Sequence, residues 1–180
     1  MRIDRKNALG LLIDMQERLV PHMWEAERLL ERTSILLQGL NVLRIPLLTT
    51  EQYPRGLGST IDRLSALGNV RDAVEKLTFS CCAEPAFMAK LEQAGLGQVI
   101  VCGIETHVCV LQTVIDLLEA NYTPVVVADC VSSRSPDDKA LAIERMRQEG
   151  ALISSAESLL FELSGVAGTS EFKAISRLIK

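Results

Sequence analysis

Short apolar runs alternate along this chain with longer stretches in which apolar residues recur at helical spacing. The runs are rich in Val, Ile and Leu and are apolar throughout, as strands buried on both faces are. We expect strands over residues 8–14, 46–51, 75–79, 99–103, 124–130 and 152–154. Because helical stretches separate most of these runs, the sequence predicts an α/β fold, with helices on both faces of a mostly parallel sheet of about six strands.

The segments between the strands predict the covering helices. Helices are expected over residues 25–41, 85–94, 108–120, 157–163 and 171–180, and one more from Ser135 to near Gly150. Residues 52–68 are rich in Gly, Pro and polar residues, which favours a long loop with a short helix around residues 61–64. No repeat or linker interrupts the 180 residues, so a single domain over residues 1–180 is predicted.

The net charge and the cysteine content limit which binding partners and which cellular compartment we expect. The formal net charge is -4 and the Lys and Arg residues are scattered, so neither nucleic acid nor an anionic membrane is an expected partner. The N-terminal segment is neither a secretory signal nor a membrane span, which favours a cytoplasmic protein. Five cysteines without a CxxC pair are expected to be free thiols in such a compartment.

Three residues with an acidic, a basic or a nucleophilic side chain lie in or directly after the predicted strands. Asp14 ends the first strand, Lys76 lies in the third, and Cys109 follows the fourth where a helix begins. Ligands of such sheets bind beyond the carboxyl ends of the strands, so these side chains are expected to converge. A carboxylate can take the proton of a thiol, while backbone N–H groups at a helix start and a nearby ammonium favour the thiolate. The set therefore predicts a cysteine nucleophile that needs no histidine base.

Three motifs carry a resemblance to a known superfamily. They are Leu12 to Gln16, the lysine of Glu75 to Ser80, and Gly103 to Val110, in which Thr106 stands three residues before Cys109. In this order and spacing the chain resembles the isochorismatase-like cysteine hydrolases, which include nicotinamidases and carbamoylsarcosine amidases. Residues 49–54, Thr-Thr-Glu-Gln-Tyr-Pro, further resemble the isochorismatase-domain-containing branch.

The resemblance implies a role for each motif residue. Asp14 would be the general base, Lys76 its electrostatic partner, and Cys109 the nucleophile that forms an acyl-thioester. It also implies an oxyanion hole made by the backbone N–H groups of Glu105 and Cys109, and a cis peptide bond between Ile104 and Glu105. The family commonly assembles, so a homo-oligomer is expected.

The chain departs from nicotinamidases where those enzymes place a histidine-rich metal site. Residues 51–56 follow the second strand here, and the only histidines, His22 and His107, lie elsewhere. We therefore expect no metal and no cofactor. Pocket candidates are Gln16, Thr106, and a lid of Gln52, Tyr53 and Arg55, in which Arg55 could bind a carboxylate.

Three functions stay open at this point. The leading one is cleavage of a C–N bond in a small amide, imide or ureido substrate, because a covalent acyl step benefits such reactions. The second is hydrolysis of a vinyl ether by Asp14 and Lys76, which needs no thiol. The third is a catalytically quiet oligomer that binds a ligand or protein, because the branch that residues 49–54 resemble is largely uncharacterised and the composition gives no clue to a substrate.

Overall fold

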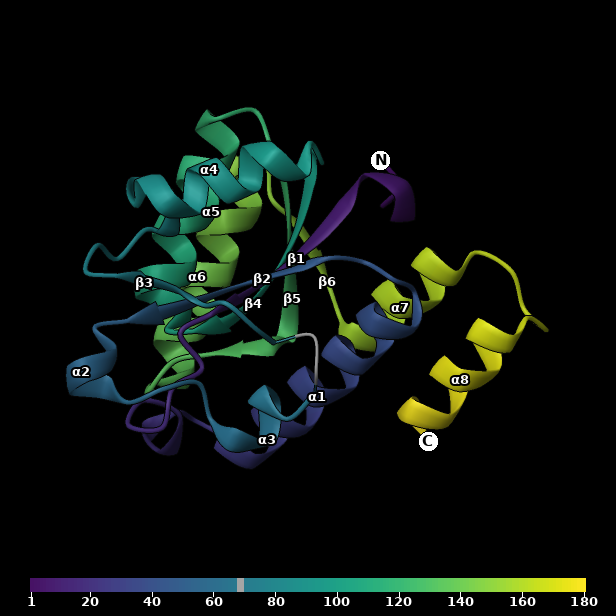
Figure 1. Ribbon diagram of the computed structural model, residues 1–180, viewed down its shortest axis with the longest axis horizontal. Helices are drawn as coiled ribbons and strands as arrows, with labels where there is room; N and C mark the ends of the chain where they lie inside the picture. The colour runs from purple at the N-terminus through teal and green to yellow at the C-terminus, as the bar shows by residue number, and fades with distance from the viewer. Residues whose placement is uncertain (68–69) are drawn as a thin grey trace.

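Residues 1–67 and 70–180, which the computed structural model describes, contain a six-stranded parallel sheet with the order β3-β2-β1-β4-β5-β6 (Figure 1). The strands are β1 (Ala8–Ile13), β2 (Leu47–Gln52), β3 (Val74–Lys76), β4 (Gln98–Ile104), β5 (Thr123–Ser132) and β6 (Leu152–Ser154). Every neighbouring pair is parallel. The predicted α/β class is confirmed, and the central strands β1 and β4 are buried along their whole length.

Helices cover both faces of this sheet (Figure 1). One face carries α1 (Ala26–Val42), α3 (Asp62–Ser65), α7 (Ala156–Ser164) and α8 (Ser170–Ile179), and the other carries α4 (Pro85–Ala94), α5 (Leu111–Glu119) and α6 (Pro136–Glu149). Each face has its own apolar core. None of the helices in the described ranges is long and apolar enough to cross a membrane.

Local sequence explains where several of these helices begin and which side they bury. In α6, the Ser135 hydroxyl accepts a hydrogen bond from the Asp137 N–H at 3.2 Å, and Pro136 occupies the first helical position. In α1, the leucines expected on the buried side, Leu29, Leu30, Leu36, Leu37 and Leu40, are buried. The side chains that the 3.6-residue period places on one face thus form the core.

The structure departs from the sequence prediction at the segments nearest the strand ends. Strand β3 stops at Lys76 instead of residue 79, and the carbonyls of Thr78 and Phe79 accept hydrogen bonds from Lys76 Nζ rather than pairing with a strand. The helix expected from residue 108 starts as a π-helical turn, η4 (Thr106–Val110), before α5. The loop after β2 holds two helical turns, α2 (Pro54–Leu57) and α3, where one was expected; its predicted end at residue 68 lies outside the described residues.

Gly103 allows the two central strands to meet at their carboxyl ends. Its φ is 124°, and a Cβ atom there would lie 2.1 Å from the carbonyl oxygen of Ile13. Only glycine fits such a backbone angle and such a close approach. The contact brings the end of β4 directly against the residue that precedes Asp14.

Candidate active site

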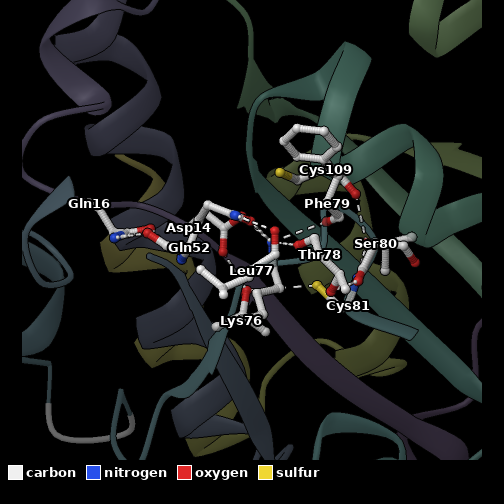
Figure 2. Close-up of polar contacts among 12 residues, drawn as sticks. Asp14, Gln16, Gln52, Lys76, Leu77, Thr78, Phe79, Ser80, Cys81 and Cys109 are labelled. Carbon is white, nitrogen blue, oxygen red and sulfur yellow. Dashed lines mark hydrogen bonds and ion pairs between the residues drawn. The ribbon is translucent and has the colours of Figure 1, made fainter. Parts of the chain in front are cut away.

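The sheet brings Asp14 and Lys76 together at the carboxyl ends of its strands. Ile13 pairs with Thr50 and with Gly103, and Gln52 pairs with Lys76, so the ends of β1 to β4 lie at one edge. Lys76 Nζ lies 2.7 Å from Asp14 Oδ2, and both side chains are closed to solvent. Figure 2 shows Cys109 and the segment from Lys76 to Cys81 around this pair.

Lys76 is held by several oxygen atoms. Besides Asp14, its ammonium donates to Gln52 Oε1 at 2.7 Å and to the carbonyls of Phe79 and Thr78 at 3.1 and 3.2 Å (Figure 2). Burial opposes the charged form, but the charge of Asp14, followed by the acidic groups of Cys81 and Cys109 and the hydrogen bond to Asp14, outweighs burial, so the pKa of Lys76 is raised. Lys76 is therefore a fixed positive charge at neutral pH.

Asp14 occupies a backbone conformation that its residue type rarely adopts. Its φ is 51°, in the left-handed region, where a non-glycine residue costs about 1 kcal/mol or more. Its N–H donates to the Thr50 carbonyl at 3.2 Å, and the Thr50 hydroxyl donates to Asp14 Oδ1 at 2.8 Å. Each carboxylate oxygen thus has a donor, and neighbouring strand ends hold the group in place.

Cys109 lies in the π-helical turn η4 and is nearly closed to solvent, with 7% of its surface exposed. Burial raises the pKa of Cys109 to about 12, and the nearby charge of Asp14 and a hydrogen bond to it act in the same direction, while Lys76 opposes them. The expected influence of Lys76 is present, because its charge lowers the pKa of Cys109, but the other effects are larger. Desolvation and the carboxylate outweigh it, and Cys109 is a neutral thiol beside a potential base.

The backbone before Cys109 makes a distinct turn. The peptide bond between Ile104 and Glu105 is cis. The Glu105 side chain accepts a hydrogen bond from Arg134 Nε at 3.0 Å, and His107 Nδ1 lies 2.9 Å from the Ser133 hydroxyl. Thr106 is completely buried, and its hydroxyl has no hydrogen-bond partner in the described part of the chain.

The proposed pocket residues divide into two groups. Gln16 is fully buried, its amide nitrogen donates to the carbonyls of Gln52 and Gly58, and its amide oxygen accepts from the Gln52 N–H. Backbone groups thus engage both N–H donors and the oxygen of this amide, and through them Gln16 holds the end of β2. Gln52 is likewise engaged, since its side chain joins Lys76 to the Leu77 carbonyl at 2.8 Å.

Tyr53 and Arg55 do lie at a cavity. Together with Lys76 they line a pocket of about 380 Å³ at the ends of β2 and β3. The Arg55 guanidinium makes no hydrogen bond or ion pair with any residue of 1–67 and 70–180. Tyr53 is half exposed and has a φ of 39°. Asp14 and Cys109 are not among the residues that line this pocket.

Sequence reasoning missed two positioning residues and one thiol. Strand and motif patterns include Thr50 but assign it no contact, although a hydroxyl next to the strand end is a signal for contact with a neighbouring end. The Thr113 hydroxyl donates to the Cys109 carbonyl at 2.6 Å and accepts from the Cys81 N–H at 3.0 Å. Cys81 lies with its sulfur 3.7 Å from Thr50 Oγ1, and burial raises its pKa to about 11.

This chain is similar in sequence to a known protein family. The isochorismatase domain model matches residues 8–158. The chain belongs to the isochorismatase family. Isochorismatase domain-containing protein 2 of Macaca fascicularis is 39% identical over 176 residues, which cover 97% of this chain and 83% of that relative.

Two solved structures of other proteins have the same fold as this chain. The structure of MAR1 ribonuclease from Caenorhabditis elegans has a TM-score of 0.92 and 35% identity, covering 99% of this chain and 92% of that one. The YcaC gene product of Escherichia coli, described as an octameric hydrolase of unknown specificity, has a TM-score of 0.93 at 20% identity, covering 99% and 90%. This chain thus has an isochorismatase-family hydrolase fold.

Proposed function

We propose that this isochorismatase-family chain is a cysteine hydrolase that works without a metal and cleaves a C–N bond of a small amide, imide or ureido compound. The observation that carries the proposal is the buried Asp14–Lys76 ion pair beside the neutral thiol of Cys109. Such a set places a proton acceptor, a fixed positive charge and a nucleophile at one point.

The acylation step follows from the resting proton positions. As Cys109 Sγ attacks the substrate carbonyl carbon, Asp14 takes the thiol proton, so no free thiolate has to exist beforehand. Because burial raises the pKa of Cys109 to about 12, the thiol is protonated at neutral pH, and this coupling avoids the separate formation of a buried thiolate. When the C–N bond breaks, Asp14 returns the proton to the leaving nitrogen, and the acyl group stays on sulfur.

Deacylation uses the same base. A water molecule attacks the thioester, Asp14 takes its proton, and that proton returns to sulfur as the acid product leaves. Lys76 keeps the carboxylate oriented through both steps because its ammonium is tied to four oxygen atoms. In this proposal the backbone N–H groups of Glu105 and Cys109 donate hydrogen bonds to the carbonyl oxygen as it becomes negatively charged.

The pocket beside Lys76 supports a preference for small substrates with a carboxylate. Arg55 is a guanidinium with unused donors at this pocket, and it can bind a carboxylate through two parallel hydrogen bonds. Tyr53 supplies an aromatic surface at the same pocket. We therefore expect a substrate with a negatively charged group away from the amide, and lower KM for it than for its neutral analogue.

Three other functions predict different results. Vinyl-ether hydrolysis would use Asp14 and Lys76 and would survive removal of the thiol. RNA cleavage, which the name of the C. elegans neighbour suggests, is disfavoured here by the net charge of -4, since RNA binding depends on basic surface. A quiet oligomeric binder would show no turnover at all.

We further propose a homo-oligomer in a reducing compartment such as the cytoplasm. Light scattering can test the assembly, and cell fractionation can test the compartment.

The test is turnover on a panel of amides, imides and ureido compounds with and without a carboxylate. Cys109→Ala is expected to abolish hydrolysis while keeping the circular dichroism spectrum, and Cys82→Ala, at a half-buried thiol outside the ion pair, is expected to retain it. Mass spectrometry of an acid-quenched reaction should find the acyl group on the Cys109 peptide. Full hydrolysis by Cys109→Ala would overturn the covalent mechanism.

A further inference from the structure

A second pocket lies away from the catalytic residues. It has a volume of about 310 Å³ and is bordered by the start of α1, the first turn of α6 and the carboxyl-terminal half of β5. Its apolar wall includes Trp24, Leu29 and Val131, and none of Asp14, Lys76 and Cys109 borders it. The pocket is therefore separate from the proposed hydrolytic site.

Lys139 is the unsatisfied group of this pocket. Its ammonium is half-buried and lies 5.5 Å from the centre of the Trp24 ring, yet it makes no hydrogen bond or ion pair within residues 1–67 and 70–180. Burial lowers the pKa of Lys139, while the charges of Asp129 and Glu25 oppose that effect. Although these two carboxylates act on its charge, neither forms a hydrogen bond or ion pair with Lys139 in the described ranges, so its donors are open to an incoming acceptor.

The other charged groups of the pocket have partners. Arg28 Nη1 lies 3.1 Å from Glu25 Oε2, and Asp129 Oδ1 accepts a hydrogen bond from the Ala156 N–H at 2.8 Å. Asp129 thereby fixes the start of α7. Lys139 is left as the cation available to an incoming group.

We propose that this pocket binds a small organic carboxylate, with its carboxylate on Lys139 and its apolar body against Trp24, Leu29 and Val131. One carboxylate supplies the acceptors that the ammonium lacks, and the Trp24 ring gives an apolar face for the remainder of the molecule. A phosphate dianion fits less well, because the carboxylates of Glu25 and Asp129 border the same pocket and repel a second negative charge.

Trp24 makes the proposal directly measurable, since it is the only tryptophan of the chain. Benzoate and hexanoate titrated into the full-length protein are expected to change its fluorescence saturably, with a Kd of about 1 mM or tighter. Benzyl alcohol and inorganic phosphate at equal ionic strength are expected to bind at least about tenfold more weakly. Calorimetry on the same samples gives a reading that does not depend on the fluorophore.

Matched variants locate the site. Lys139→Gln should weaken benzoate binding about tenfold or more, Lys139→Arg should retain it, and Lys173→Gln, at an exposed lysine of α8, should bind like the unaltered protein. Cys109→Ala should also bind benzoate normally. The outcome of the binding experiment therefore does not depend on whether the protein hydrolyses its proposed substrates. The proposal is overturned if no saturable binding is found, if Lys139→Gln binds equally well, or if Cys109→Ala abolishes binding.

Discussion

Lys76 and Asp14 stand 62 positions apart in the sequence, yet their side chains form a 2.7 Å ion pair that is fully closed to solvent. A buried pair of this kind contributes little net stability, because desolvation of both charges offsets their attraction. Removing one partner of the pair destabilises the protein, because the remaining charge is then buried without a counter-charge. The pair thus constrains the protein at the point where the proposed chemistry takes place.

The first prediction concerns this pair. Lys76→Met should lower the free energy of unfolding by about 3 to 5 kcal/mol, because Asp14 is left as an uncompensated buried charge. The double variant Asp14→Asn with Lys76→Met should recover part of the loss, since both charges are gone. Urea denaturation measures all three proteins, with Lys173→Met as an exposed control. A loss below about 1 kcal/mol for Lys76→Met would contradict the buried pair.

The second prediction separates the two roles of Asp14. Besides burial, its charge raises the pKa of Cys109, so Asp14→Asn should speed alkylation of Cys109 by iodoacetamide at pH 8 severalfold. Hydrolysis should be lost in the same variant because the proton acceptor is missing. Peptide mass spectrometry follows labelling at Cys109, and Cys102, which is buried in β4, reports any unfolding. Slower labelling of Cys109 would show that the carboxylate does not act on the resting thiol.

The third prediction tests Thr50 as a positioning residue. Thr50→Val removes the hydroxyl that donates to Asp14 Oδ1 and should lower kcat about tenfold with little change in KM, whereas Thr50→Ser should retain most activity. Thr49→Val is a matched control on the same strand, because the buried Thr49 hydroxyl has no partner in the described ranges. Equal activity of Thr50→Val and Thr49→Val would remove Thr50 from the site.

The fourth prediction concerns alkaline pH. The pKa of Cys109 is about 12 in the folded protein and near 9 in an unfolded chain, so the unfolded state loses its proton first as pH rises. The stabilisation is complete below about pH 9 and is lost toward pH 12, with a slope approaching about 1.4 kcal/mol per pH unit from this thiol. Urea midpoints at pH 8 and pH 10.5 measure it. Cys109→Ala should show a shallower decline, and an unchanged decline would refute the shift.

The fifth prediction isolates the close approach at Gly103. Gly103→Ala combines a positive φ with a Cβ atom 2.1 Å from the Ile13 carbonyl oxygen. Gly95→Ala, at the end of α4, has a φ of 63° and no atom within 4 Å of the added Cβ. Gly95→Ala should cost about 1 kcal/mol, and Gly103→Ala clearly more, because it also separates β1 from β4. Similar thermal midpoints for both variants would show that β1 and β4 are not in such close contact.

Much of the architecture was predictable because local signals and burial agree. The helix from Pro85 to Ala94 and the strand from Leu152 to Ser154 lie where the sequence placed them. Prediction failed at strand ends, where contacts between distant segments override local preference. The β pattern continues past Lys76, but the carbonyls of Thr78 and Phe79 turn back to the ammonium.

The sequence by itself determined the α/β class and the family, and it is the source of the proposal for Asp14, Lys76 and Cys109, because periodicity and motifs are local properties of the chain. Tertiary structure decided how these groups behave. Burial beside the Asp14 carboxylate makes Cys109 a neutral thiol, although its place at a helix start favours a thiolate. The end of β2 and the loop after it engage the Gln16 amide through the carbonyls of Gln52 and Gly58. Both outcomes depend on desolvation and on neighbours far away in sequence, which only the folded chain brings together.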